Sequence, residues 1–176
     1  MTDTDDAPVR IVSYDASWPS SFEAERAVLA NVLEAWLVGS IEHVGSTAVP
    51  GLAAKPVIDI MAPVGDLDAS RPAIAALTAV GYCHFPYRPE RMHWFCKPSP
   101  AFRTHHLYLV PHDGPTWRER LLFRDVLRAR PDILAEYAAL KQRLATLHEF
   151  DRETYTDAKS PFVERVLGMA SGLIRE

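Results

Sequence analysis

The sequence predicts an α+β fold, in which a small mixed β-sheet with flanking helices is followed by a helical C-terminal half. Two short apolar runs, residues 41–44 and 56–61, follow a first amphipathic helix. Two further runs, residues 91–96 and 104–110, are rich in aromatic and β-branched residues and are bounded by Pro, Gly or Ser, which is typical of strands. From about residue 116 onward the pattern is helical.

The first helix is expected just after Trp18-Pro19. Ser20 stands three residues before Glu23, the spacing of a capping box. Apolar residues then recur with helical period, at Phe22, Val28, Leu29, Val32, Leu33, Trp36 and Leu37. Beyond the strand at 41–44 we expect a loop over 45–54 with room for a helical turn, and then a mostly buried strand at 56–61.

A second helix is expected from Ser70, with Pro72 just inside it and Gly81 just past its end. In the strand at 104–110, alternation places one set of side chains on one face and the other set opposite: His106, Tyr108 and Val110 against His105, Leu107 and Leu109.

Three helices are expected in the last third. Thr116 and Glu119 form a second capping box, and Pro131 ends that helix. A longer helix runs to about His148, and Ser160-Pro161 opens the last one.

Composition limits the class of protein. A chain of 176 residues, 48% of them hydrophobic, suffices for one core, so we expect a flexible tail over residues 1–8 and a single domain over residues 9–176. Nineteen Lys and Arg against 23 Asp and Glu give a net charge of −4, which argues against nucleic acid or an anionic membrane as partner. Any phosphate-binding surface must then be local.

The two cysteines and the N-terminus indicate a cytoplasmic protein. Cys83 and Cys96 are too few for a disulfide framework and lack zinc-site spacing, so we interpret them as reduced, mostly buried thiols. The opening MTDTDDAPVR is acidic and polar, unlike a signal peptide, and no apolar run approaches membrane-spanning length.

The segment HVGSTAVPGLAAKPVIDI, residues 43–60, carries the strongest functional signal. Gly45, Ser46 and Thr47 offer a close backbone approach, main-chain N–H groups and hydroxyls, which suit phosphate oxygens. Lys55 adds a positive charge, and Asp59 is suited to a divalent cation bridging phosphates. Two plainer interpretations stay open: an ordinary strand-to-strand turn, and a structural pair between Asp59 and Lys55 or an arginine.

Several segments resemble the GrpB family in the family's own order. They are Tyr14-Asp15, Trp18-Pro19, GSTAVPGLAAKPVIDI (45–60), Thr104-His105-His106 and FRDVLRARPDILAEYAALK (123–141). The resemblance runs from about Val12 to the last helix. It implies a nucleotidyltransferase-like fold, with a Gly-Ser turn after the first core strand and a carboxylate on the next. Family members also occur fused to dephospho-CoA kinase.

The metal site implied by the resemblance departs from the broader superfamily, where two acidic residues stand two positions apart on the strand. Here the second position is Met61. Glu42, His43 and His106 are the candidates for the remaining ligands of a Mg²⁺ or Mn²⁺ ion, and Glu42 and His43 face opposite sides of their strand. His106 is a metal ligand or general base in one interpretation and a hydrogen-bonded structural residue in the other.

Cationic side chains supply further candidates for phosphate binding. Arg120, Arg124 and Arg128 recur at four-residue spacing, which on its own is typical of a solvated helix face. The resemblance places Arg124 and Arg128 toward the cleft, with Asp125 orienting one of them, and leaves Arg120 on the surface. Arg91, Lys141 and Lys159 match family motifs and either reach the same anion or serve solubility. Tyr137 and Tyr155 either stack a base or pack the edge of the core.

Two functions follow, and they differ on whether the protein is an enzyme. In the first, a nucleotide or other phosphorylated small molecule donates a nucleotidyl or phosphoryl group with metal help, and the catalytic residues are Asp59, Lys55 and His106. In the second, the protein is a non-catalytic phospho-ligand-binding or accessory module related to coenzyme A synthesis. Nothing indicates an organic cofactor, and the sequence names no protein partner.

Overall fold

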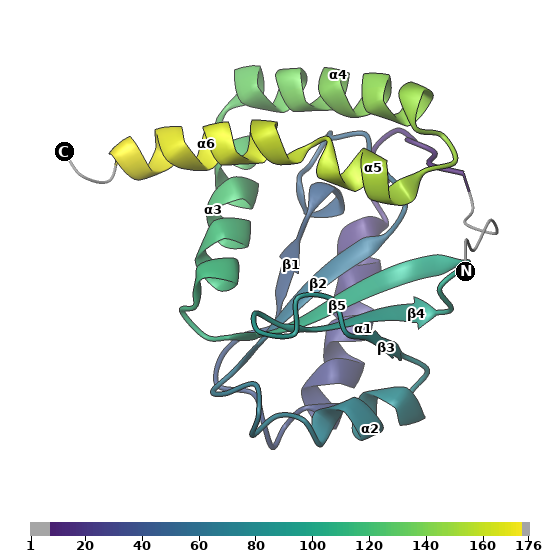
Figure 1. Ribbon diagram of the computed structural model, residues 1–176, viewed down its shortest axis with the longest axis vertical. Helices are drawn as coiled ribbons and strands as arrows, with labels where there is room; N and C mark the ends of the chain where they lie inside the picture. The colour runs from purple at the N-terminus through teal and green to yellow at the C-terminus, as the bar shows by residue number, and fades with distance from the viewer. Residues whose placement is uncertain (1–7, 174–176) are drawn as a thin grey trace.

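The computed structural model describes residues 8–173, and within this range a five-stranded sheet organises the chain (Figure 1). The strands are β1 (Glu42–Val44), β2 (Ile58–Val64), β3 (Cys83–Phe85), β4 (His93–Pro98) and β5 (Arg103–Pro111), in the order β1-β2-β5-β4-β3. β2 and β5 are parallel and the other pairs are antiparallel, so the predicted mixed sheet is confirmed.

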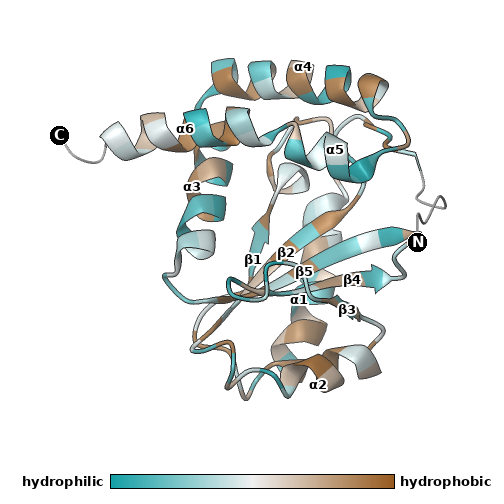
Figure 2. Ribbon diagram, in the orientation of Figure 1, coloured by the Kyte–Doolittle hydropathy of each residue, from teal (hydrophilic) through white to brown (hydrophobic). Residues whose placement is uncertain are grey.

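Helices lie on both sides of this sheet. α1 (Trp18–Val32) and α2 (Ala73–Ala79) cover one face. The C-terminal half is helical as predicted: α3 (Pro115–Ala129), α4 (Pro131–Leu147), α5 (Arg152–Asp157) and α6 (Ser160–Leu173). In Figure 1, α4 and α6 lie side by side above the sheet, with α3 descending from them past β1. Brown and teal alternate along α4 in Figure 2, as expected of a helix with one buried face.

The two predicted capping boxes are wrong. α1 begins at Trp18, so Ser20 lies inside it, and its hydroxyl donates to the carbonyl oxygen of Ser17 at 2.8 Å. α3 begins at Pro115 after Gly114, so Thr116 also lies inside its helix. In both helices a proline occupies the first turn, where its missing N–H costs nothing, and it sets the start.

Other boundaries also differ from the prediction. α1 ends at Val32 rather than near Leu37, which instead bridges to Val64. The expected helical turn in the loop is present as the 3₁₀ turn η1 (Ser46–Ala48). Most of the predicted tail, residues 1–8, lies outside the described residues.

Alternation along β5 is confirmed and assigns the two faces of the sheet. Leu107 and Leu109 enter the core beneath α1 and α2. Tyr108 and Val110 pack on the opposite face with side chains from β1, β2 and α3: Val44, Met61 and Trp117. This second face also carries a row of directly paired residues across all five strands, in the order Val44, Asp59, His106, Cys96 and Cys83.

A separate apolar cluster joins the helical half to the loop after η1. Val49 and Leu52 of the loop are fully buried against residues of α3, α4 and α6, which are Leu127, Ile133, Tyr137, Phe162 and Val166. The Gly45–Ala54 segment is therefore held between the sheet and the helical layer. Within residues 8–173, no helix combines the length and apolar character needed to cross a membrane.

Candidate functional site

The turn after β1 requires glycine for two independent reasons. Gly45 has φ of +71°, a conformation that residues with a Cβ rarely adopt. A Cβ at this position would also approach Oδ2 of Asp59 to within the distance of a severe clash, with the Cγ of Asp59 at 2.9 Å. The carboxylate of Asp59 thus lies directly against the backbone of the turn.

Asp59 is ionised and held by two side chains of β5. Its Oδ1 accepts a hydrogen bond from the hydroxyl of Tyr108 at 3.0 Å and lies 3.1 Å from Nδ1 of His106. Burial raises the pKa of this carboxyl, but the hydrogen bonds from His106 and Tyr108 and the charge of Arg120 outweigh it and bring the pKa to about 2. Because Asp59 is ionised, Nδ1 of His106 is the donor in their contact.

Three lysines surround the same region with little counter-charge. The ammonium groups of Lys55 and Lys159 lie 5.0 and 4.4 Å from the ring centroid of Tyr155, and Lys159 lies between α5 and α6. Lys141, on α4, donates to Oγ of Ser46 at 3.0 Å and to the carbonyl oxygen of Ala53. Within the described range, none of the three has a carboxylate oxygen within 4.0 Å.

The pKa values of these lysines reflect that environment. Burial is the largest cause that lowers the pKa values of Lys55, Lys141 and Lys159, and neighbouring positive charges add to it. Lys159 acts in this way on Lys55 and Lys141, and Arg120 acts on Lys159. Together these causes bring the pKa to about 7 for Lys55 and Lys141 and to about 8 for Lys159. An anion in this region would raise these pKa values.

These side chains line one cavity of about 500 Å³ between the sheet and the helical layer. Its lining includes eleven of the candidates named from the sequence, which are Gly45, Ser46, Thr47, Lys55, Asp59, Arg91, His106, Tyr137, Lys141, Tyr155 and Lys159. Arg91 is paired with Glu119 at 2.9 Å. Tyr108 and Arg120 are lining residues that the sequence did not indicate, and the guanidinium carbon of Arg120 lies 3.9 Å from the ring centroid of Tyr108. Tyr108 follows His106 by two positions on a strand, so alternation alone was a usable signal for it.

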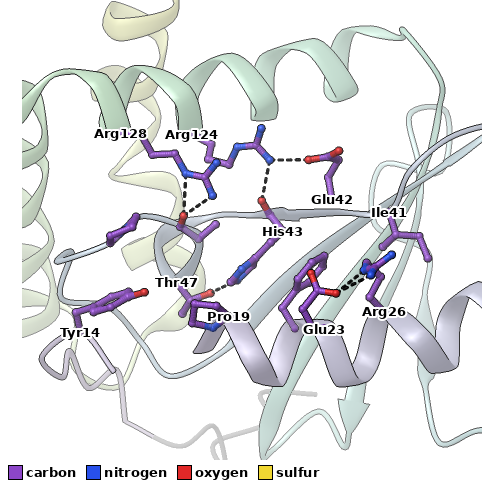
Figure 3. Close-up of a pocket in the computed structure, with 13 residues that line it drawn as sticks. Tyr14, Pro19, Glu23, Arg26, Ile41, Glu42, His43, Thr47, Arg124 and Arg128 are labelled. Atoms are coloured by element: carbon purple, nitrogen blue, oxygen red, sulfur yellow. Dashed lines mark hydrogen bonds and ion pairs between the residues drawn. The ribbon is translucent and has the colours of Figure 1, made fainter. Parts of the chain in front are cut away.

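Arg124 and Arg128 do not line this cavity, and the expectation that they face the Asp59 cleft is wrong. They line a second pocket of about 450 Å³ between α1 and α3, on the other side of η1 (Figure 3). Nη1 of Arg124 donates to Glu42 at 2.7 Å and to the carbonyl oxygen of His43 at 3.0 Å. Nε and Nη2 of Arg128 donate to the carbonyl oxygen of Ala48 at 3.0 and 2.7 Å.

The two arginines therefore brace the backbone on both sides of the Gly45 turn from α3. Asp125 orients Arg124 as expected, accepting from its Nε at 2.8 Å. Arg120, expected on the surface, is the member of the series that reaches the cavity. A four-residue step overshoots one helical turn by about 40°, so the stripe winds around α3 and its two ends face different directions.

The expected metal ligands Asp59, Glu42 and His106 do not form a site. Glu42 shares a sheet face with Asp59, but its carboxylate pairs with Arg124 in the second pocket. Nε2 of His106 is buried and has no hydrogen-bond partner among the described residues. Within residues 8–173 no group of three His, Cys, Asp or Glu side chains is arranged to hold a metal ion.

Met61 and His43 also serve structure. Met61, two positions after Asp59 on β2, is fully buried in one apolar cluster with Tyr108. His43 points to the opposite face, stacks on Phe22 with ring centroids 4.8 Å apart, and has Nε2 2.9 Å from Oγ1 of Thr47. Burial lowers its pKa to about 4, so its ring is neutral at pH 7.

Comparisons with known proteins agree with the predicted resemblance. The model of the family described as GrpB protein matches residues 8–168. UPF0157 protein PA4798 of Pseudomonas aeruginosa is 41% identical over 180 residues, which cover 99% of this chain and 72% of that protein. The crystal structure of conserved protein GrpB from Enterococcus faecalis has a TM-score of 0.85 and 29% identity, covering 95% of this chain and all of that one.

Similarity also extends to a longer protein. A dephospho-CoA kinase of Mycolicibacterium paratuberculosis is 31% identical over 186 residues, which cover 89% of this chain but 44% of the kinase. More than half of that protein therefore lies outside the shared region. Since the family model spans all but the first and last few residues and the same fold recurs in a solved member, the chain belongs to the GrpB family.

Proposed function

We propose that the cavity binds a phosphorylated small molecule, such as a nucleotide. The observation that carries the proposal is the charge around it: Lys55, Lys141, Lys159 and Arg120 face a space in which Asp59 is the one inner carboxylate among the residues described. The other acidic lining residues are Glu119, which pairs with Arg91, and Asp157 and Glu164, which are exposed.

Burying ammonium groups without counter-ions is unfavourable, and proteins usually avoid it. A phosphate group in the cavity supplies the missing charge and restores the ordinary ionisation of the lysines. The Ser46 hydroxyl accepts from Lys141 and lines the same cavity. A volume of about 500 Å³ falls in the range of small-molecule sites, about 300–1,000 Å³.

Transfer of a nucleotidyl or phosphoryl group is a second candidate, favoured by the ionised Asp59 in a cation-lined cavity. Lys55, Lys159 and Arg120 would neutralise charge that develops on the transferred group. Binding without transfer accounts for more of the geometry, because Met61 replaces the second carboxylate and Nε2 of His106 is enclosed. The similarity to a dephospho-CoA kinase supports an accessory role in coenzyme A synthesis as one form of this binding function.

A thermal-shift titration tests the binding proposal. The probes are inorganic phosphate, pyrophosphate, AMP, ADP, ATP and coenzyme A precursors, each in EDTA and with Mg²⁺ or Mn²⁺. A ligand at about 100 times its Kd adds roughly 2.7 kcal/mol to the free energy of unfolding. We expect stabilisation by at least one phosphorylated probe, and its loss in Lys159→Met. Arg71→Met, which removes a cation from an exposed pair with Asp68, is the matched control and leaves the shift unchanged.

The titrations in EDTA and with divalent ions distinguish binding without transfer from group transfer. Stabilisation in EDTA that survives Asp59→Asn supports binding without transfer. Stabilisation that requires a divalent ion and Asp59, together with turnover of ATP, supports transfer. If no phosphorylated probe stabilises the protein, the assignment of the cavity to phosphate is wrong.

A further inference from the structure

Cys83 and Cys96 are directly paired across the β3–β4 hairpin. They are register partners in an antiparallel pair, so their side chains lie on the same face of the sheet. Directly paired antiparallel residues have Cα atoms about 4.5–5.5 Å apart, which is within the range of about 4.4–6.8 Å that a disulfide requires. Sγ of Cys83 lies 3.6 Å from the carbonyl oxygen of Pro98, so its side chain leans over β4. Both are free thiols in this structure.

The hairpin that these cysteines would close carries part of the cavity rim. The segment between them contributes Tyr87, Arg88, Arg91 and Met92 to the lining. Arg88 has φ of +47°, and Tyr87 is 45% exposed. A covalent bond between Cys83 and Cys96 would join β3, an edge strand, to β4 at the base of this segment.

We propose that Cys83 and Cys96 are an oxidation site that forms a reversible cross-strand disulfide when the protein meets a peroxide. Cys83 is partly exposed and Cys96 is fully buried, so the sulfur of Cys83 attacks the peroxide. The O–O bond breaks, Cys83 becomes a sulfenic acid and water leaves. The sulfur of Cys96 then displaces the hydroxyl group, which leaves as a second water. Two thiols and one hydrogen peroxide give one disulfide and two waters.

Burial raises the pKa of the Cys96 thiol and so leaves less of it as thiolate, which disfavours Cys96 for the first attack on the peroxide. Oxidation of Cys83 and Cys96 does not require a ligand in the cavity, so its test is independent of the test of the proposed phosphate binding.

Intact-mass spectrometry of the native full-length chain tests this site. After hydrogen peroxide and then iodoacetamide, we expect a mass loss of two hydrogens, no alkylation and an internal Cys83–Cys96 peptide link, all reversed by dithiothreitol. The oxidised chain should melt at a higher temperature than the reduced one, because a cross-link restricts the unfolded state.

Cys83→Ser and Cys96→Ser serve as controls, and neither should lose the two hydrogens. The proposal is overturned if the oxidised native protein keeps both thiols open to alkylation in denaturant, or carries sulfinic acid on Cys83 without a link. It is equally overturned if the disulfides join two chains.

Discussion

Lys141 is buried, Lys55 and Lys159 are partly buried, and all three line the cavity. Each has its pKa lowered by burial and by neighbouring positive charge. Lys97 offers a contrast, since its ammonium group meets a carboxylate oxygen of Glu25 at 2.9 Å. Removing the charge of a lysine without a carboxylate partner should therefore raise the free energy of unfolding of the ligand-free protein. Removing the charge of a lysine paired with a carboxylate should lower it.

Lys55→Met is expected to stabilise the protein without ligand by about 1–2 kcal/mol at pH 7, because it removes an uncompensated buried charge and keeps most of the apolar volume. Lys97→Met, the matched control, should destabilise the protein, because the carboxylate of Glu25 loses the ammonium group that pairs with it. Urea denaturation measures both. Equal destabilisation by the two substitutions would contradict the interpretation of Lys55.

Asp59 makes a prediction about acid stability. Its pKa in the folded protein, about 2, is below the ordinary value of 3.8, so its contribution is complete above about pH 4 and is lost as the pH falls toward 2. A shift of this size corresponds to about 2 kcal/mol. Wild type should lose that much more free energy of unfolding between pH 4 and 2 than Asp59→Asn does. Parallel pH profiles for the two proteins would count against an ionised, hydrogen-bonded Asp59.

At the scale of elements, the turn between β1 and η1 can be tested by comparing alanine substitutions at two glycines. Gly45→Ala meets both a positive φ and the Asp59 carboxylate, whereas Gly51→Ala meets a φ of +79° with nothing within 4 Å of the new Cβ. The backbone cost common to both is about 1–2 kcal/mol. We expect Gly45→Ala to lose at least twice as much stability as Gly51→Ala, measured by chemical denaturation. Similar losses would show that Asp59 does not press on the turn.

Element length accounts for part of what could be predicted from the sequence. β2, β5, α3 and α4 have enough residues for periodicity to appear, and their existence and order were predicted. β3 and α5, three and six residues long, show no period and were not predicted, although β1, also three residues long, was predicted at 41–44. The helix starts were misplaced because Ser20 and Thr116 have capping-box spacing, while the prolines before them set the actual first turns.

The site residues that lie close together in the sequence could be predicted from it. Gly45, Ser46, Lys55 and Asp59 lie on a loop and the strand that follows it, so one stretch of sequence carries them all. Lys141 lies on α4 and Lys159 lies between α5 and α6, both far from this stretch in sequence, and they were selected through the family resemblance. The direction of Arg124 and Arg128 depends on how α3 crosses β1, a tertiary feature that no spacing encodes.

For the molecule as a whole, net charge and local charge differ in sign. The chain carries −4 at pH 7, yet its cavity is lined by Lys55, Lys141, Lys159 and Arg120. An anion in the cavity favours the charged lysines and raises their pKa values. At pH 8 a bound polyanion should therefore be accompanied by proton uptake, and affinity should fall as the pH rises above about 8.

Calorimetric titration with pyrophosphate at pH 8, in two buffers of different ionisation enthalpy, measures that uptake. The expected value is positive for the wild type and smaller for Lys55→Met. Binding with no proton exchange would mean that the anion lies away from the lysines.

The measurement that tests the central claim most directly is a crystal structure of the protein grown with pyrophosphate. We expect electron density for the anion within hydrogen-bond distance of Lys55, Lys141 or Lys159, beside the Gly45 turn. Two results would contradict binding at the lysines. One is density for the anion in the second pocket, against Arg124 and Arg128. The other is a cavity without the anion in crystals grown with pyrophosphate well above the calorimetric Kd.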